Sequence, residues 1–234
     1  MSAELNITGK CFFCEELVAK SNINTHLKKH LKELSKTEGD QDKKSYLLKI
    51  FTYPNYKNSN YFLYLLVDGE TTMKKVDRFL RDIWLDCCGH LSAFAYKGGG
   101  KLGMSKKLKD ALNKGDVLEY EYDFGSTTDL QIKVEEEYPM GVKSKVLLLS
   151  RNEPLEIYCQ KCKKLPAVHL CVAHLYEDQP HFFCESCAEI HEKECEGFLD
   201  YASMPVVNSP RMGECGYEGG FIDLERDGVF EIKK

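Results

Sequence analysis

Apolar runs in the middle of the chain predict two neighbouring strands. Residues 46–53 (YLLKIFTY) and 61–68 (YFLYLLVD) are rich in the aromatic and branched side chains that are typical of strands. The polar stretch PNYKNSN at 54–60 lies between them and predicts a turn. Because consecutive strands usually lie side by side, the two are expected to pair in one sheet.

The period of the apolar residues then changes to that of a helix. Met73, Val76, Leu80 and Ile83 recur at helical spacing within residues 71–88, which predicts a helix with one apolar face. Further elements follow this helix: a strand at 92–96, a short helix within 104–116, and strands at 117–125, 129–138 and 142–150. This order predicts an α+β fold for the central domain, with a mixed sheet, a helix packed on one face and a β-grasp-like arrangement.

Segments of different composition flank the central domain of residues 46–150. Residues 1–36 form a compact unit with closely spaced cysteines and histidines. The polar stretch 37–45 predicts a linker, so the N-terminal unit is expected to move relative to the rest. Residues 151–200 are rich in cysteine and histidine, and residues 201–234 are rich in glycine and proline. That last segment is expected to wrap another element instead of folding alone.

The overall composition is that of a globular protein in a reducing compartment. Of the 234 residues, 43% are hydrophobic and 29% are charged. No apolar run approaches the roughly 20 residues needed to span a bilayer, and the N-terminus lacks the features of a signal peptide. The eleven cysteines are odd in number and fall mostly in Cys-x-x-Cys pairs near histidines, which indicates zinc. A cytoplasmic protein without a membrane partner is expected.

The N-terminal unit has the spacing of a zinc finger. Two residues separate Cys11 from Cys14, eleven residues separate Cys14 from His26, and His30 shares a helical face with His26. A unit this short buries too little apolar area to fold without its metal. Residues 1–36 are therefore predicted to be a zinc-finger-like module.

Four pairs of metal-ligand residues follow one another in the cysteine-rich segment: Cys159/Cys162, Cys171/His174, Cys184/Cys187 and His191/Cys195. Tetrahedral zinc takes four ligands, so alternating pairs predict a cross-brace, in which pairs one and three hold one ion and pairs two and four hold another. Such closed sites leave no position for water, so the ions would be structural. Three zincs per chain are expected.

Two alternatives involve fewer ions. A ribbon-like site made from pairs one and three alone would lower the expected zinc content to two per chain. A single site within residues 184–195 would leave Cys159 and Cys162 without a role. His169 and His181 are also competitors for the place of His174.

A stretch of the central domain resembles a known family. Trp84, Gly89, His90, Leu91 and Phe94, followed by Tyr-Asp-Phe-Gly at 122–125, match the plasmid pRiA ORF-three-like family, and the resemblance extends over roughly residues 46–220. The family pattern continues with an Asp, a Trp and a His, where this chain has Ser126, Thr128 and Leu130. In this respect the chain resembles a sub-branch of the family that has a trailing zinc-binding segment. The resemblance implies a fold and an association with mobile elements, and it implies no established activity.

Two basic segments are candidates for contact with nucleic acid. The candidate lysines lie on the finger helix and in the glycine-rich stretch 96–109: Lys28, Lys29, Lys32, Lys101, Lys106 and Lys107. A solvated basic surface is an equally good interpretation for the helix and a better one for the glycine-rich stretch. The chain as a whole carries a net charge of −5, and residues 174–200 are strongly acidic. The C-terminal zinc module is therefore expected to bind a protein.

These features favour a non-enzymatic zinc-binding adaptor for a protein or nucleic-acid partner. The alternative is an enzyme with a cleft between the central domain and the C-terminal tail, using Cys215, Arg211 or Asp123. The spacing gives Cys215 no metal-binding partner. Cys87 and Cys88 follow the helical pattern and are expected in the core, with His90 at a turn.

Overall fold

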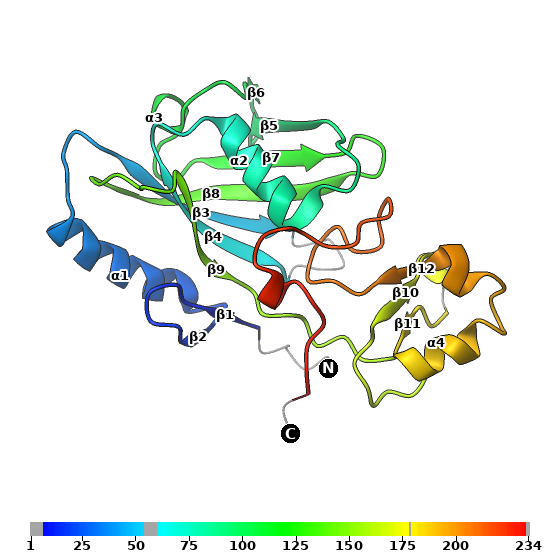
Figure 1. Ribbon diagram of the computed structural model, residues 1–234. Helices are drawn as coiled ribbons and strands as arrows, with labels where there is room; N and C mark the ends of the chain where they lie inside the picture. The colour runs from blue at the N-terminus through cyan, green and yellow to red at the C-terminus, as the bar shows by residue number, and fades with distance from the viewer. Residues whose placement is uncertain (1–6, 54–59, 178, 233–234) are drawn as a thin grey trace. The chain divides into compact units, whose positions relative to one another are not determined.

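The computed structural model describes residues 7–53, 60–177 and 179–232. The chain divides into two compact units. The first comprises residues 1–81 and 90–153, and the second comprises residues 82–89 and 154–234 (Figure 1). Among the described residues, none of the helices combines the length and the apolar character that crossing a membrane requires.

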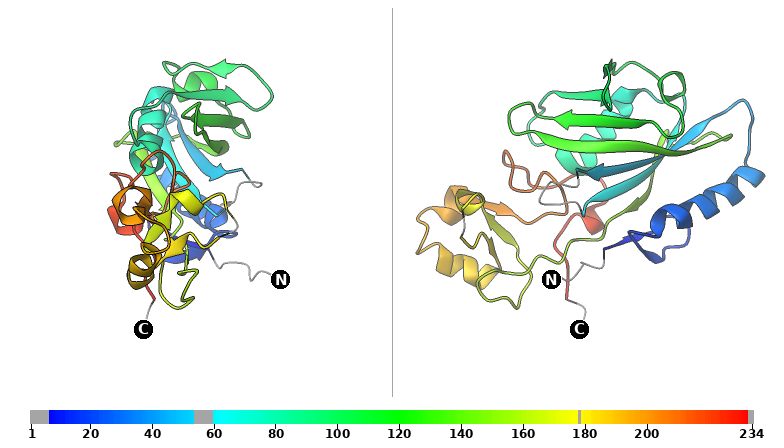
Figure 2. Two further views of the ribbon diagram at one scale, coloured as in Figure 1. Left: turned by 90° about the vertical axis from the view of Figure 1, so that its right-hand side faces the viewer. Right: turned by 180° about the vertical axis from the view of Figure 1, so that it is seen from behind.

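In the described part of the chain, seven strands form one sheet at the centre of the first unit (Figure 2). In sheet order they are β6 (Lys101–Leu102), β5 (Ser92–Tyr96), β7 (Val117–Tyr122), β8 (Thr128–Tyr138), β3 (Ser45–Thr52), β4 (Phe62–Asp68) and β9 (Val146–Arg151). Each described pairing in this sheet is antiparallel. The turn predicted at 54–60 falls, except for residue 60, outside the described residues.

The prediction of a mixed, β-grasp-like sheet is therefore wrong, whereas the α+β class is correct. Three neighbouring pairs, β3 with β4, β5 with β6, and β7 with β8, are consecutive in the chain. Short connections of this kind join antiparallel strands, since a parallel pair needs a long crossover. The strands other than β6 and their order along the chain were predictable from the sequence, but their directions were not.

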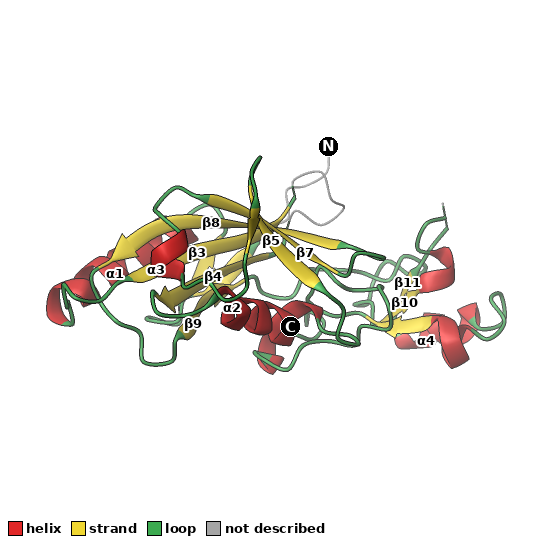
Figure 3. Cartoon of the chain, turned by 90° about the horizontal axis from the view of Figure 1, so that it is seen from above, coloured by secondary structure: helices red, strands yellow, loops and turns green. Residues whose placement is uncertain are grey.

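Helices cover both faces of the central sheet, where the sequence predicted a helix on one. Helix α2 (Met73–Leu80) lies on one face (Figure 3). There the carboxylate of Asp77 accepts a hydrogen bond from the hydroxyl of Tyr120 in β7 at 2.8 Å. Helix α1 (Ile23–Thr37) packs on the other face, where Leu27 shares a hydrophobic cluster with Leu47 of β3. A short helix, α3 (Leu108–Ala111), follows β6. The strand β4 is buried at every position because both of its faces are covered.

The N-terminal module shares its core with the sheet. Its hairpin, β1 (Thr8–Lys10) and β2 (Leu17–Ala19), precedes α1. Buried residues of the module and of the sheet form a single cluster that includes Ile23, Leu27 and Leu31 with Phe62 and Leu66. The backbone N–H of Phe12 also donates to the carbonyl of Leu149 in β9 at 2.9 Å. The expected independent movement of the finger is therefore not found, because its apolar helix face is buried against the sheet.

The second unit contains a small antiparallel sheet and the cysteine- and histidine-rich segments. Its described strands are β11 (Phe182–Phe183), β10 (His169–Cys171) and β12 (Ser203–Pro205), in that order. Helical segments are η2 (Val172–His174), α4 (Glu185–His191), η3 (Phe198–Ala202) and η4 (Leu224–Arg226).

The C-terminal tail wraps the chain segment 82–89, as expected of a segment that cannot fold alone. The π-helical turn η1 (Arg81–Leu85) continues from α2. The hydroxyl of Ser209 donates to the carbonyl of Trp84 at 2.6 Å, and the N–H of Phe221 donates to the carbonyl of Asp82 at 2.6 Å. These bonds place residues from two distant parts of the sequence in the same unit.

Candidate metal centres

Within the described residues, cysteines and histidines converge in four groups, and the ligand atoms of each group lie within 4.8 Å of one another. They are the finger group (Cys11, Cys14, His26, His30), the first-brace group (Cys159, Cys162, Cys184, Cys187), the second-brace group (Cys171, His174, His191, Cys195) and the tail group (Cys87, Cys88, His90, Cys215). Together they contain all eleven cysteines of the chain. Each group offers the four sulfur or nitrogen ligands that structural zinc takes.

The finger group is assembled by the hairpin and the helix of the N-terminal module. The turn after β1 carries Cys11 and Cys14, and its conformation is held by the N–H of Cys11, which donates to the carbonyl of Glu16 at 2.9 Å. His26 Nε2 lies 3.2 Å from Cys14 Sγ and 3.2 Å from His30 Nε2. With zinc–nitrogen bonds of about 2.05 Å, tetrahedral geometry separates two nitrogen ligands by about 3.3 Å. The observed spacing fits a zinc ion.

Burial also sets the protonation of this group. It raises the pKa of the Cys11 thiol, so a thiolate at this position needs a cation beside it. Burial, together with the neighbouring His30, lowers the pKa of His26 and favours its neutral imidazole. A neutral imidazole is the form that binds a metal.

The first-brace group consists of two Cys-x-x-Cys pairs from different elements. Cys184 occupies the N-cap position of α4, which places Cys187 one turn further on. Cys162 Sγ lies 3.8 Å from Cys184 Sγ. Zinc–sulfur bonds of about 2.3 Å in a tetrahedron separate two sulfurs by about 3.8 Å. The two pairs are therefore spaced as ligands of one zinc ion.

Backbone N–H groups favour the thiolate form of one cysteine in this group. The N–H groups of Leu165 and Lys164 donate to Cys162 Sγ and lower its pKa to about 6. Burial and the hydrogen bond with Cys184 instead raise the pKa of Cys187 to about 12. Without a cation, these converging thiols could not all ionise near neutral pH, whereas a zinc ion stabilises all four thiolates.

The second-brace group contains two histidines, of which His191 is buried and His174 is half-buried. Among the described residues, neither Nε2 of His191 nor Nδ1 of His174 has a hydrogen-bond partner, and both atoms are buried. Phe183 stacks on the His191 ring at 4.2 Å between centroids and fixes its orientation. A buried polar atom without a partner is costly, and a zinc ion would satisfy both nitrogens. These two atoms are the expected zinc ligands, with Cys171 and Cys195.

The grouping follows the predicted cross-brace. Pairs one and three meet in one group, and pairs two and four meet in the other. The structure thus brings together pairs two and four, which the ribbon-like alternative would leave without metal. It also places Cys184 and Cys195 in different groups, whereas the alternative of a single site within residues 184–195 would join them. The competitors of His174 have other contacts: His169 lies between Ser203 and Glu185, and His181 Nδ1 lies 3.0 Å from the carbonyl of Gln179. The bound metal itself stays a prediction.

Sequence reasoning missed the tail group. Cys87 is half-buried and Cys88 is exposed, so the expectation that both lie in the core is wrong for Cys88. Cys215, for which spacing offered no partner, has its Sγ 3.7 Å from that of Cys88. A count of cysteines could have indicated it. The three predicted zinc sites use eight of the eleven cysteines, which leaves Cys87, Cys88 and Cys215 for a further group.

The lysines proposed for nucleic acid differ in their surroundings. Lys28 is half-buried and its Nζ lies 3.3 Å from the carboxylate of Glu135 in β8. Lys107 pairs with Glu70 at 2.7 Å. The other four, Lys29, Lys32, Lys101 and Lys106, are exposed.

The residues of the enzyme alternative belong to different units. Asp123 follows β7 in the first unit, where its Oδ2 lies 3.4 Å from His90 Nε2. Arg211 and Cys215 belong to the second unit. The predicted cleft between domain and tail therefore stays a prediction.

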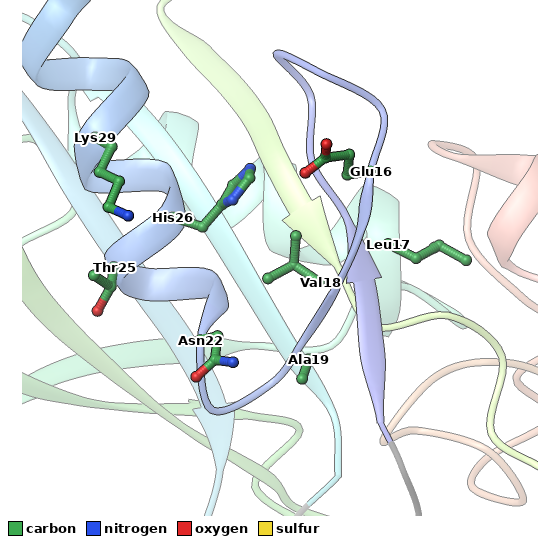
Figure 4. Close-up of a pocket in the computed structure, with 8 residues that line it drawn as sticks. All are labelled: Glu16, Leu17, Val18, Ala19, Asn22, Thr25, His26 and Lys29. Carbon is green, nitrogen blue, oxygen red and sulfur yellow. The ribbon is translucent and has the colours of Figure 1, made fainter.

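A pocket of about 510 Å³ opens between the finger hairpin and the first turns of α1. Figure 4 shows its lining: Glu16, Leu17, Val18, Ala19, Asn22, Thr25, His26 and Lys29. Asn22 is the N-cap residue of α1, and Thr25 lies in the first turn of that helix. The pocket thus lies at the N-terminal end of α1 and includes His26, one of the predicted zinc ligands.

Comparisons with known proteins give little further information. A scan against protein-family models finds no match for the chain, and a search of curated proteins finds none either. Five chains of solved structures match, and one of them is a protein of unknown function, MM3350 from Methanosarcina mazei Go1. It is 20% identical over 46% of this chain and 68% of that chain, with a TM-score of 0.38. The likeness carries no functional argument, and the resemblance to the plasmid pRiA ORF-three-like family stays a prediction.

Proposed function

We propose that the protein is a non-enzymatic, zinc-stabilised adaptor whose C-terminal module binds a basic protein segment. The zinc-ligand groups support this function because each supplies four protein ligands and leaves no open position for a reacting water. Such ions hold a fold in place. The function would then reside in the surface that they hold.

The observation that carries the proposal is an exposed apolar strip on α4 and η3. Ile190 is 46% exposed, Leu199 is 45% exposed and Tyr201 is 77% exposed. The N–H of Leu199 donates to the Glu192 carboxylate at 2.5 Å, so η3 is held close to the end of α4. A cluster of exposed apolar side chains on a rigid scaffold is typical of a protein-binding surface.

The charge around this strip selects the chemistry of the partner. Exposed carboxylates lie on α4, on the loop that follows it and on η3: Glu185, Glu189, Glu194, Glu196 and Asp200. Lys161 pairs with Glu194 at 2.8 Å, and the remaining carboxylates keep the surface acidic. A surface of this sign attracts a segment rich in lysine or arginine and repels the phosphates of nucleic acid.

Substituting the apolar strip tests the proposal. The double variant Ile190→Ser, Leu199→Ser should keep its zinc and its fold but bind the partner at least about tenfold more weakly, because two apolar anchors are lost. The partner is captured from nuclease-treated lysate, identified and purified, and its affinity is measured at low and physiological salt. Leu165→Ser is the matched control, since Leu165 is an exposed apolar residue of the same unit, outside the strip.

Three results together support the proposal: the purified partner is basic, its binding weakens with salt, and the control binds as the wild type does. A captured protein that is acidic, or that binds the double variant unchanged, would rule out this surface. A partner that is lost on nuclease treatment would assign the binding to nucleic acid.

The pocket beside α1 favours a second candidate function, contact between the finger and nucleic acid. Its rim carries the exposed side chains of Asn22, Thr25 and Lys29, and Lys32 follows one turn later on the helix. Lys28 pairs with Glu135, which leaves fewer lysines for phosphates than the sequence suggested. The contact is therefore expected to be weak and dependent on salt.

Replacing Lys29 and Lys32 with glutamate should weaken this binding. Each lysine that neutralises a phosphate contributes about one unit to the slope of log affinity against log salt, so the double variant should lose about two. Gel-shift titration at several salt concentrations measures the slope. Point variants are preferable to deleting the finger, because deletion would uncover the sheet face that α1 buries.

Lys143→Glu is the control for charge alone, since Lys143 is exposed and lies outside the finger. An equal loss of affinity in this control would show a general charge effect. Unchanged binding by the Lys29 and Lys32 variant would exclude the finger helix as the nucleic-acid element.

A further inference from the structure

We propose that the tail group is a fourth zinc site, in which Cys87, Cys88 and Cys215 supply three thiolates and His90 supplies an imidazole. Cys87 Sγ lies 3.8 Å from Cys88 Sγ, which lies 3.7 Å from Cys215 Sγ. Tetrahedral zinc with three thiolates separates its sulfurs by about 3.8 Å. These distances match the one between Cys162 and Cys184 in the first-brace group.

The local backbone brings these ligands together. Cys215 has a φ of 48°, and the glycines on either side of its turn, Gly213 and Gly216, have φ values of 84° and 66°. A cysteine in the left-handed region costs energy, and such residues cluster at functional sites. On the other segment, the carboxylate of Asp86 accepts a hydrogen bond from the N–H of Gly89 at 3.1 Å. His90 follows Cys88 by only two residues, so this turn keeps both residues on one short segment.

The charge around the thiols suits a thiolate-rich site. Zinc with three thiolates and a neutral imidazole would carry one net negative charge. Arg211 is fully buried, and its Nη2 lies 3.6 Å from Cys87 Sγ. The guanidinium would offset that negative charge, and its hydrogen bond would favour the thiolate of Cys87. Soft sulfur ligands of this kind select zinc over calcium or magnesium.

The three thiolates of the site would link two segments of the second unit. Cys87 and Cys88 belong to residues 82–89, whereas Cys215 belongs to the tail. A shared zinc ion would join these two segments, although Cys88 and Cys215 are 127 positions apart in the sequence. Cys88 and Cys215 are both exposed, unlike the buried cysteines of the first-brace group. The fourth ion is therefore expected to be the first to leave when a chelator is added.

Zinc content of the full chain tests this site. The wild type, purified without chelator under reducing conditions, should contain four zincs per chain, and Cys215→Ser should contain three. Glu218→Gln, an exposed substitution in the same loop, should keep four. A wild type with three zincs and a Cys215→Ser variant that also has three would overturn the proposal.

Labelling of the wild type gives an answer that does not depend on any variant folding. Iodoacetamide should leave Cys88 and Cys215 unmodified in the zinc-loaded protein and should modify both once mild EDTA treatment has removed one equivalent of zinc. Immediate labelling of these exposed thiols before the chelator is added would contradict the site. A Cys88–Cys215 disulfide found by mass spectrometry in the freshly purified, reduced protein would contradict it as well.

Discussion

Replacing Cys159 with serine is expected to remove two zinc ions from the protein. Cys159 is fully buried and belongs to the first-brace group. The second pair of that group, Cys184 and Cys187, lies in sequence between the two pairs of the second-brace group. Loss of one ion frees the start of α4, which also carries His191, so the second site should lose its geometry too.

The small core of this module explains why the loss should be complete. Its buried cluster consists of Cys159, Cys171, Cys184 and Cys187 together with two phenylalanines and two alanines. This core is too small to fold by itself, and structural zinc contributes about 10–16 kcal/mol of binding free energy to such modules. Zinc analysis and the dispersion of amide resonances from residues 159–205 measure the effect.

Lys164→Ala provides the matched control for this variant. Its side chain is exposed, and its backbone N–H, which donates to Cys162, is kept. The control should keep both ions and the folded module. Loss of a single zinc from Cys159→Ser, with the second-brace group intact, would show two independent sites and contradict the interleaved arrangement.

Replacing Cys11 with serine should destabilise the central sheet as well as the finger. Cys11 is fully buried in the cluster that the finger shares with the sheet. When the finger unfolds, it uncovers Leu47, Phe62, Tyr64 and Leu66 on one sheet face. We expect the free energy of unfolding of the first unit to fall by about 3–5 kcal/mol, the range found when a large side chain is removed from a core.

Hydrogen exchange of the amides in β3 and β4 measures this coupling, with denaturant unfolding as a second readout. Leu17→Ala is the control, since Leu17 lies in the same module and is 53% exposed. The control should leave exchange unchanged. If Cys11→Ser speeds exchange only within residues 7–36, the finger folds independently and the shared core contributes little.

The ligand pairs were predictable because each is local. Two ligands separated by two or three residues point to one metal whatever the rest of the chain does, and the alternation of four such pairs indicated which would meet. The tail group has no such pattern: Cys215 and Cys88 are 127 positions apart. Only the wrapping of the tail around residues 82–85, through bonds such as that from Ser209 to Trp84, brings them together.

The sequence of β4 also indicates that both faces of the sheet are covered. The run FLYLLVD is apolar at almost every position, which is typical of a strand buried on both faces. Only one covering helix was predicted, because the polar stretch at 37–45 was interpreted as a flexible linker. Linker composition describes the connecting residues, and it carries no information on whether Leu27 and Leu31 have a surface to pack against.

Sequence alone determined the α+β class, the main strand and helix segments of the central domain, and twelve of the candidate metal ligands with their grouping. All of these depend on interactions between near neighbours in the chain or on spacing that repeats within it. The tertiary structure decided the antiparallel strand directions, the docking of the finger on the sheet and the assembly of Cys87, Cys88, His90 and Cys215. Those features depend on which distant surfaces bury each other, and the hydrophobic effect that drives this burial has no direction and specifies no partner along the sequence.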